Sequence, residues 1–273
     1  MEKQNAAAIL LLKQATTLNI HTGNLVNWSR LKKKCPSSTS EELQGCIRET
    51  LSEWCTKIAP AQEKEAPSTL ECSLTQTTDA IIPEEREELK VSVKLFLSGS
   101  DPSSIRIAVD LACSTLGVSQ LDSVIIVSPP LPEGVSLTLE HLQPHWEELE
   151  SLLQSHKIAA IGTSDLDKPL LEQLYMWAKV KPSSNQVNLA SCCVMPPDLT
   201  AFAKEYDIQL LTHNDSKELI TETNFQESVS EGVKDAVVVD WSLEWVLRYS
   251  VIVKSRGIIK SKGYLVQAKR IIS

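Results

Sequence analysis

The fold of this chain is decided by residues 157–193, KIAAIGTSDLDKPLLEQLYMWAKVKPSSNQVNLASCC, which follow the pattern strand, polar loop, helix, strand. IAAIG is a short apolar run typical of a strand buried on both faces, and it ends in the polar turn TSD. Asp167 is expected to cap a helix whose leucines recur at helical spacing, and Pro182 ends that helix. NQVNL then begins a second strand. A β-α-β unit of this kind predicts a parallel sheet.

The same alternation extends over most of the 273 residues. Eight candidate strands are predicted at residues 18–21, 70–75, 90–97, 123–127, 158–162, 185–189, 208–212 and 251–253. Most of those from residue 90 onward are followed by a helical pattern. This arrangement favours an α/β fold, an eight-stranded parallel β/α (TIM-type) barrel that forms one domain over residues 1–273. The N-terminal quarter diverges most from the pattern.

Helix boundaries are predicted from capping residues. Thr39, with Glu42 three residues later, forms a capping-box pattern at the start of a helix over residues 40–58. A second helix over residues 103–116 is expected to end at Gly117. Residues 213–235 are acidic and weakly periodic, so we expect a long loop there.

Charge and cysteine content exclude several classes of function. The net charge is −8, although residues 245–273 contain seven Lys and Arg and no acid. An acidic protein with one basic segment is not expected to bind nucleic acid. The seven cysteines include no CxxC pair, so we expect no metal site. The N-terminal AAAILLL is too short to span a bilayer and has no secretory flank, which predicts a cytoplasmic protein with reduced thiols and no membrane contact.

Four segments carry a resemblance to a known family: LGVSQLDSVIIVSPP, KIAAIGTSDLD, KPSSNQVNLASC and WVLRYSVIVKSRG. In this order they resemble the aldo-keto reductase barrel from residue 90 onward. The whole chain, including HTGNLVNW, KVSVKLF and VIVKSRGIIKSKGY, resembles the regulatory (modifier) subunits of glutamate-cysteine ligase, a divergent branch of the reductase superfamily. The resemblance implies a heterodimer with the ligase catalytic subunit, better use of glutamate and weaker feedback inhibition by glutathione in glutathione biosynthesis.

Reductase chemistry needs a proton donor at the carbonyl oxygen, and the resemblance implies a tyrosine near the second strand. A phenol with a pKa of about 10 needs a nearby cation to act as an acid near neutral pH. The tyrosines of this chain are Tyr175, Tyr206, Tyr249 and Tyr264, none of them in the first half. Lys94 stands where the family has its catalytic lysine, and Ser128 stands where it has a histidine. We therefore expect no catalytic residues, with Lys94 as a vestigial charge paired with a carboxylate.

The family's cofactor-binding positions are partly retained. Ser164, Asp165 and Gln186 match the residues that hold the nicotinamide amide, and His213 matches the aromatic position that stacks on it. An aspartate accepts hydrogen bonds but cannot donate like asparagine, which weakens the amide pairing. Lys254, Ser255 and Arg256 match the segment that grips the 2'-phosphate of NADP, or else form a solvated or partner-facing patch.

We expect that no cofactor is required. Two alternatives stay open: an NADPH-dependent carbonyl reductase with an atypical proton donor, and an adaptor that senses NADP(H). Cys192 and Cys193 are either small core residues or redox-sensitive thiols at a subunit interface.

Overall fold

The structure is a computed structural model that describes residues 2–28, 35–58, 67–73, 80–189, 194–234 and 241–271. The chain divides into two compact units, each made of separate stretches. Unit 1 comprises Met1–Asp79, Ser216–Val246 and Ser261–Ser273, and unit 2 comprises Ala80–Asp215 and Leu247–Lys260. The single domain over residues 1–273 stays a prediction.

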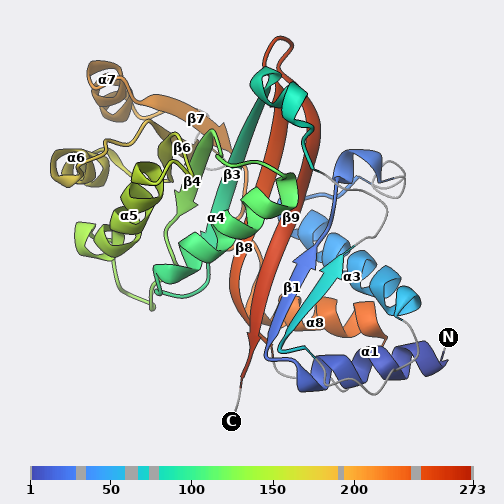
Figure 1. Ribbon diagram of the computed structural model, residues 1–273. Helices are drawn as coiled ribbons and strands as arrows, with labels where there is room; N and C mark the ends of the chain where they lie inside the picture. Colours follow the sequence, from blue (N-terminus) through green and yellow to red (C-terminus); the bar gives the residue numbers. More distant parts are fainter. Residues whose placement is uncertain are drawn as a thin grey trace. The chain divides into compact units, whose positions relative to one another are not determined.

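Unit 2 is built around five parallel strands that follow one another in sequence order (Figure 1). They are β3 (Leu89–Leu97), β4 (Ser123–Val127), β5 (Ile161–Ser164), β6 (Ser184–Asn188) and β7 (Gln209–His213). Each strand pairs in parallel with the next. Because parallel neighbours need a crossover connection, a helix lies between most successive strands. The predicted α/β class is confirmed.

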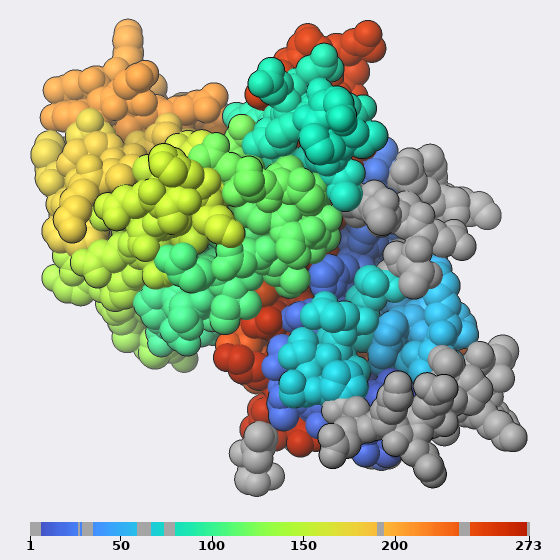
Figure 2. All heavy atoms as spheres, viewed as in Figure 1, coloured from blue at the N-terminus to red at the C-terminus, as the bar shows by residue number. Residues whose placement is uncertain are grey.

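The α-helices in the described part of unit 2 each bury a set of apolar residues. They are α4 (Ser103–Leu116), α5 (Leu139–Gln154), α6 (Lys168–Trp177) and α7 (Pro197–Glu205). The 3-10 helix η2 (Pro83–Glu88) precedes β3 and buries none of its residues. Asp167 caps α6 as predicted, since its carboxylate accepts the Leu170 N–H at 3.0 Å. Gly117 ends α4 in the left-handed region, at φ 65°. In Figure 2 the atoms of α4, α5 and α6 form a continuous surface on this face of unit 2.

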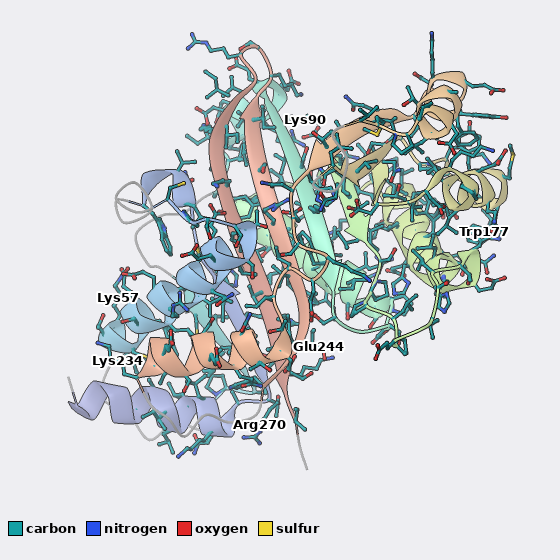
Figure 3. The ribbon with its side chains drawn as sticks, turned by 180° about the vertical axis from the view of Figure 1, so that it is seen from behind. Lys57, Lys90, Trp177, Lys234, Glu244 and Arg270 are labelled. Carbon is teal, nitrogen blue, oxygen red and sulfur yellow. The ribbon has the colours of Figure 1, made fainter. Side chains whose placement is uncertain are left out.

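In its described residues, unit 1 combines a small group of strands with three α-helices. β1 (Thr17–His21) runs parallel to β2 (Thr69–Ser73), and η1 (Leu25–Asn27) follows β1. The helices are α1 (Glu2–Gln14), α3 (Thr39–Lys57) and α8 (Glu222–Val233). α3 packs along α8. Figure 3 labels Lys57, the last residue of α3, and Lys234, which follows α8, at the same end of this helix pair.

Two long strands, β8 (Trp241–Val253) and β9 (Ile258–Arg270), depart from the predicted eight-stranded parallel barrel. Only residues 251–253 were predicted as a strand. β9 pairs with β1 in the antiparallel direction, and β8 lies between β9 and β3, so the described residues contain nine strands and not all are parallel. The physical reason lies in the alternation of buried residues along β8, which include Trp241, Leu243 and Trp245. A period of two over this length stabilises an extended hairpin.

Three further predictions need correction. Residues 213–235 are not a long loop, because α8 forms there and buries Phe225 and Val229, four residues apart. The N-cap of α3 is Ser38 and not Thr39, since the Ser38 hydroxyl accepts the Glu41 N–H at 3.1 Å. β5 begins at Ile161, while the predicted start at Ile158 makes an isolated bridge to Leu121.

Candidate functional site

Polar side chains from three neighbouring strands of unit 2 meet at the carboxyl ends of those strands. Ser164 is the last residue of β5, Gln186 lies beside it on β6, and His213 ends β7. Lys94 reaches the same face from β3, where its ammonium group donates to Gln186 Oε1 at 2.6 Å. The carboxyl ends of parallel strands share one edge of a sheet, so residues far apart in sequence converge here.

A buried ion pair lies at the centre of this face. The Lys94 ammonium lies 2.8 Å from Asp215 Oδ2, and these side chains are 5% and 2% exposed. Arg248 on β8 binds the same carboxylate in a bidentate manner, at 2.6 and 2.9 Å. The carboxylate expected to pair with Lys94 is therefore Asp215. Below, the charge cluster denotes Lys94, Asp165, His213, Asp215 and Arg248.

Asp215 and Arg248 were not singled out from the sequence. Asp215 lies in the stretch predicted as a loop, and Arg248 lies in the basic C-terminal segment. A signal for Arg248 was present, because it is a lone charge inside an apolar run of β8, WVLRY. Charged residues are rarely buried in a strand unless they are paired.

His213 joins the charge cluster to Asp165 through a closed hydrogen-bonded ring. The ring consists of Asp165, Asn188, Asp215 and His213. His213 Nε2 lies 2.9 Å from both carboxylate oxygens of Asp165, and the Asp215 N–H donates to His213 Nδ1 at 3.1 Å. Asn188 completes the ring, since its N–H donates to Asp165 Oδ1 and its side-chain amide donates to the Asp215 carbonyl, both at 2.8 Å.

The charge cluster changes the pKa of its members in opposite directions. Burial disfavours the Asp215 carboxylate, but favourable interactions with His213, Arg248 and Lys94 outweigh it and hold its pKa far below the ordinary value. Burial lowers the pKa of Lys94, although Asp215 opposes this effect. For His213 burial favours the neutral ring, but the two aspartates prevail and raise its pKa.

The proximity of Ser164, His213 and Asp165 does not form a catalytic triad. A triad needs the serine on one imidazole nitrogen and the carboxylate on the other. Here the Ser164 hydroxyl lies 3.5 Å from Nε2, the nitrogen that already faces Asp165. Nδ1 is occupied by a main-chain N–H. The geometry therefore provides no relay to activate Ser164.

The residues at the nicotinamide-amide positions use their polar groups in hydrogen bonds to other residues of unit 2. Gln186 Oε1 accepts from Lys94, and the Asp165 carboxylate accepts from His213 and Asn188. Asp165 also has a left-handed backbone, at φ 57°, which is uncommon for a residue other than glycine. A nicotinamide amide would have to replace these internal bonds, so the arrangement does not fit that group.

Three predicted residues of the phosphate segment lie in the turn between β8 and β9. Lys254, Ser255 and Arg256 are exposed there. The Lys254 ammonium donates to the Glu87 carbonyl at 2.8 Å, and the Lys254 N–H donates to the Glu88 carbonyl at 2.9 Å. These contacts tie the turn to η2 and not to the charge cluster.

The other predicted positions lie apart from the charge cluster. Ser128 follows β4 and lines a small cavity with Pro129, His145 and Trp146. Ile126 and Thr163 line the same cavity, and the alternation of side chains along strands places them on the face opposite to Lys94. Cys192 and Cys193 lie outside the described residues.

The described cysteines are mostly buried. Cys35, Cys46, Cys55, Cys72 and Cys113 are free thiols, of which Cys35 is exposed. Burial raises the pKa of Cys55 to about 11, which disfavours the reactive thiolate. Within the described ranges no group of three or more potential ligands is placed to hold a metal ion. Among the same residues no helix is both long and apolar enough to cross a membrane.

The Aldo/keto reductase family model matches residues 72–258. A glutamate–cysteine ligase regulatory subunit from Mus musculus is 65% identical over 271 residues, which cover 99% of both chains. The chain belongs to the glutamate–cysteine ligase regulatory subunits of the aldo/keto reductase family. Both resemblances drawn from the sequence are confirmed.

A second mammalian regulatory subunit matches over the same length. The Homo sapiens subunit is 64% identical over 271 residues, again 99% of both chains. Among solved structures, a Bombyx mori aldo-keto reductase in complex with NADP has a TM-score of 0.39 at 20% identity, and the match covers 47% of this chain and 42% of that chain.

Proposed function

We propose that the chain is the regulatory subunit of a glutamate–cysteine ligase. It binds the catalytic subunit as a heterodimer, improves the use of glutamate and relieves inhibition by glutathione. The observation that carries this proposal is the 64–65% identity to proteins named glutamate–cysteine ligase regulatory subunit, over 99% of both chains. Regulation of this kind requires contacts that differ between two states of the partner.

The chain is proposed to have no reductase activity of its own. The Lys94 ammonium bonds to Asp215 and Gln186, and both partners are acceptors. A lysine that lowers the pKa of a phenol must lie beside that phenol. The bonds of Lys94 therefore support a structural role for it.

The regulatory role is proposed to need no cofactor. The polar groups of Asp165 and Gln186 are used within unit 2, and Lys254 bonds to main-chain carbonyls of η2. These contacts support a reductase fold in which the residues at the nicotinamide-binding positions have a structural role, since they join strands of unit 2. We further propose a cytoplasmic location. We also propose that the chain has no nucleic-acid partner, which the net charge of −8 supports.

The proposal is tested by reconstitution. The purified chain is mixed with the ligase catalytic subunit, and ligation rates are measured over a range of glutamate and glutathione concentrations. The expected result is a lower KM for glutamate and weaker inhibition by glutathione than for the catalytic subunit alone. No change in either quantity, with sedimentation showing no complex, would refute the regulatory role.

A parallel assay tests the absence of catalysis. NADPH oxidation is followed with a panel of aldehydes, and heat of binding is measured by calorimetry with NADPH alone. Aldehyde-dependent turnover that is lost in Lys94→Met would establish reductase activity and contradict the proposal. Binding that is lost in Lys254→Glu and Arg256→Glu would place a nucleotide at the β8–β9 turn.

A further inference from the structure

The hydrogen bonds of the ring of Asp165, Asn188, Asp215 and His213 all form together in one protonation state of His213. Nδ1 accepts the Asp215 N–H, so it carries no proton in this arrangement. Nε2 faces the Asp165 carboxylate and therefore carries the proton of the neutral ring. The main chain at Asp215 thus selects the tautomer of His213.

Protonation of His213 cannot leave this ring unchanged. A proton added from solvent at Nδ1 would point at the Asp215 N–H, and two donors cannot share a hydrogen bond. The nearest alternative acceptor is the Asp215 carboxylate, whose Oδ2 lies 3.4 Å from Nδ1. The imidazolium would then bridge two carboxylates, with Nε2 still on Asp165.

We propose that His213 is a proton-operated switch of the turn from His213 to Asp215. Neutral His213 accepts the main-chain N–H of Asp215 and closes the ring. Protonated His213 releases that N–H and binds the Asp215 side chain. The switch exchanges a bond to the main chain for a bond to the carboxylate that also holds Lys94 and Arg248.

The charges around His213 determine what its protonation does to the charge cluster. Asp165 follows β5, Lys94 comes from β3 and Arg248 comes from β8, while Asp215 follows His213 on its own segment. While His213 is neutral, the two positive charges of Lys94 and Arg248 balance the two negative charges of the aspartates. Its protonation adds one positive charge to a buried group, so the face becomes cationic.

The surroundings also set the direction of the pH response. Burial favours neutral His213, but its hydrogen bonds to Asp165 and Asp215 outweigh burial and raise its pKa above the ordinary value of about 6.5. A raised folded-state pKa means that the stabilisation is fully present below the unfolded value and is lost as pH rises through the folded one. The carboxylate-bound state therefore prevails at acidic pH and the ring state above the folded pKa.

The experiment is a pH titration of the full-length chain followed by nuclear magnetic resonance. The 15N shifts of both imidazole nitrogens of His213 report its tautomer, and the Asp215 amide shift reports the main-chain bond. We expect the Asp215 amide to move with the same midpoint as His213, and the high-pH state to carry its proton on Nε2. A chemical shift of the Asp215 amide that stays constant while His213 titrates would overturn the proposal.

Three variants separate the switch from a structural role. His213→Asn keeps an acceptor for the Asp215 N–H, in the side-chain-to-backbone turn that asparagine favours, but cannot titrate. In this variant the Asp215 amide should stay in its high-pH position throughout. Asp165→Asn retains His213 and removes one carboxylate, so the midpoint should fall. His156→Gln, at an exposed site, is the control and should leave the titration of His213 and Asp215 unchanged.

A titrating Asp215 amide in His213→Asn would assign the pH response to another group and refute the switch. If His213→Asn fails to fold, as judged by circular dichroism, Asp165→Asn still decides. An unchanged midpoint in Asp165→Asn would mean that this carboxylate does not bind the imidazolium, which contradicts the bridged state.

Discussion

The ammonium nitrogen of Lys94 lies 2.8 Å from Asp215 Oδ2, with side chains that are 5% and 2% exposed. An unpaired charge at such a site is strongly disfavoured, so each side chain depends on the other. Asp215 has a second cationic partner in Arg248, whereas Lys94 has Gln186 as its other acceptor. Asp215 therefore keeps a cationic partner when Lys94 is lost, whereas Lys94 keeps the neutral acceptor Gln186 when Asp215 is lost.

Removal of the carboxylate should cost more stability than removal of the amine. Asp215→Ala leaves Lys94 and Arg248 without their shared acceptor, and should lower the free energy of unfolding by about 3–5 kcal/mol. Lys94→Met should cost less, because Arg248 still neutralises Asp215. Urea unfolding measures both. The control is Asp110→Ala, whose partner Lys157 is 41% exposed, with an expected cost below about 1 kcal/mol. Equal losses at Asp110 and Asp215 would contradict the assignment.

The stability contributed by Asp215 should disappear in acid. Its pKa is held far below the ordinary value of about 3.9. A carboxylate with a lowered folded-state pKa contributes stability that is present above the unfolded value and lost as pH falls through the folded one. The difference in unfolding free energy between the wild type and Asp215→Asn should shrink as the pH falls below about 5, where the carboxyl group of the unfolded chain takes up its proton. Urea unfolding at several pH values below about 5 checks this, and a difference that grows over that range would refute it.

Helices α3 and α8 approach closely at Gly232. A Cβ placed there would lie 2.9 Å from the Leu51 Cβ and 3.0 Å from the Arg48 carbonyl oxygen. Gly232→Ala should therefore destabilise the chain by about 1–3 kcal/mol, because backbone must shift to admit the methyl group. Gly45→Ala in α3 is the matched control, since nothing lies within 4 Å of its Cβ position. That change should stabilise by about 0.5–1 kcal/mol. Thermal unfolding distinguishes the two, and effects of the same sign would disprove the close contact.

The start of α3 offers a test of the corrected N-cap. Ser38→Ala removes the hydroxyl that accepts the Glu41 N–H and should cost about 1 kcal/mol. Thr39→Ala should have little effect, because the buried Thr39 hydroxyl has no hydrogen-bond partner among the described residues. Chemical denaturation of both variants decides between the two caps. A larger loss for Thr39→Ala would restore the cap predicted from the sequence.

Local patterns predicted most of unit 2. The strand over residues 123–127 and the helix over residues 103–116 were predicted at the observed bounds. α8 was missed because small residues such as Ser228 and Gly232 weaken its apolar stripe, although Phe225 and Val229 are at helical spacing. No strand was predicted over β9, whose lysines interrupt its apolar pattern, whereas β9 buries Tyr264, Leu265 and Val266 between β1 and β8.

The candidate site was predicted only in part, because some of its residues are far apart in the sequence. Lys94, Ser164, Asp165, Gln186 and His213 follow from motif positions in or directly after the strands of unit 2. Asp215 follows from none, because its partner Lys94 is 121 positions away in sequence. No spacing rule connects two residues across five strands.

The sequence by itself determined what depends on neighbours along the chain: the β-α-β units, the caps at Asp167 and Gly117, and the family. Only the tertiary structure decided which carboxylate neutralises Lys94 and which tautomer His213 adopts. Strand order and register bring Asp215, Arg248 and Asp165 to one face of unit 2. Burial there makes each charge depend on its partners, and that dependence is a property of three-dimensional proximity.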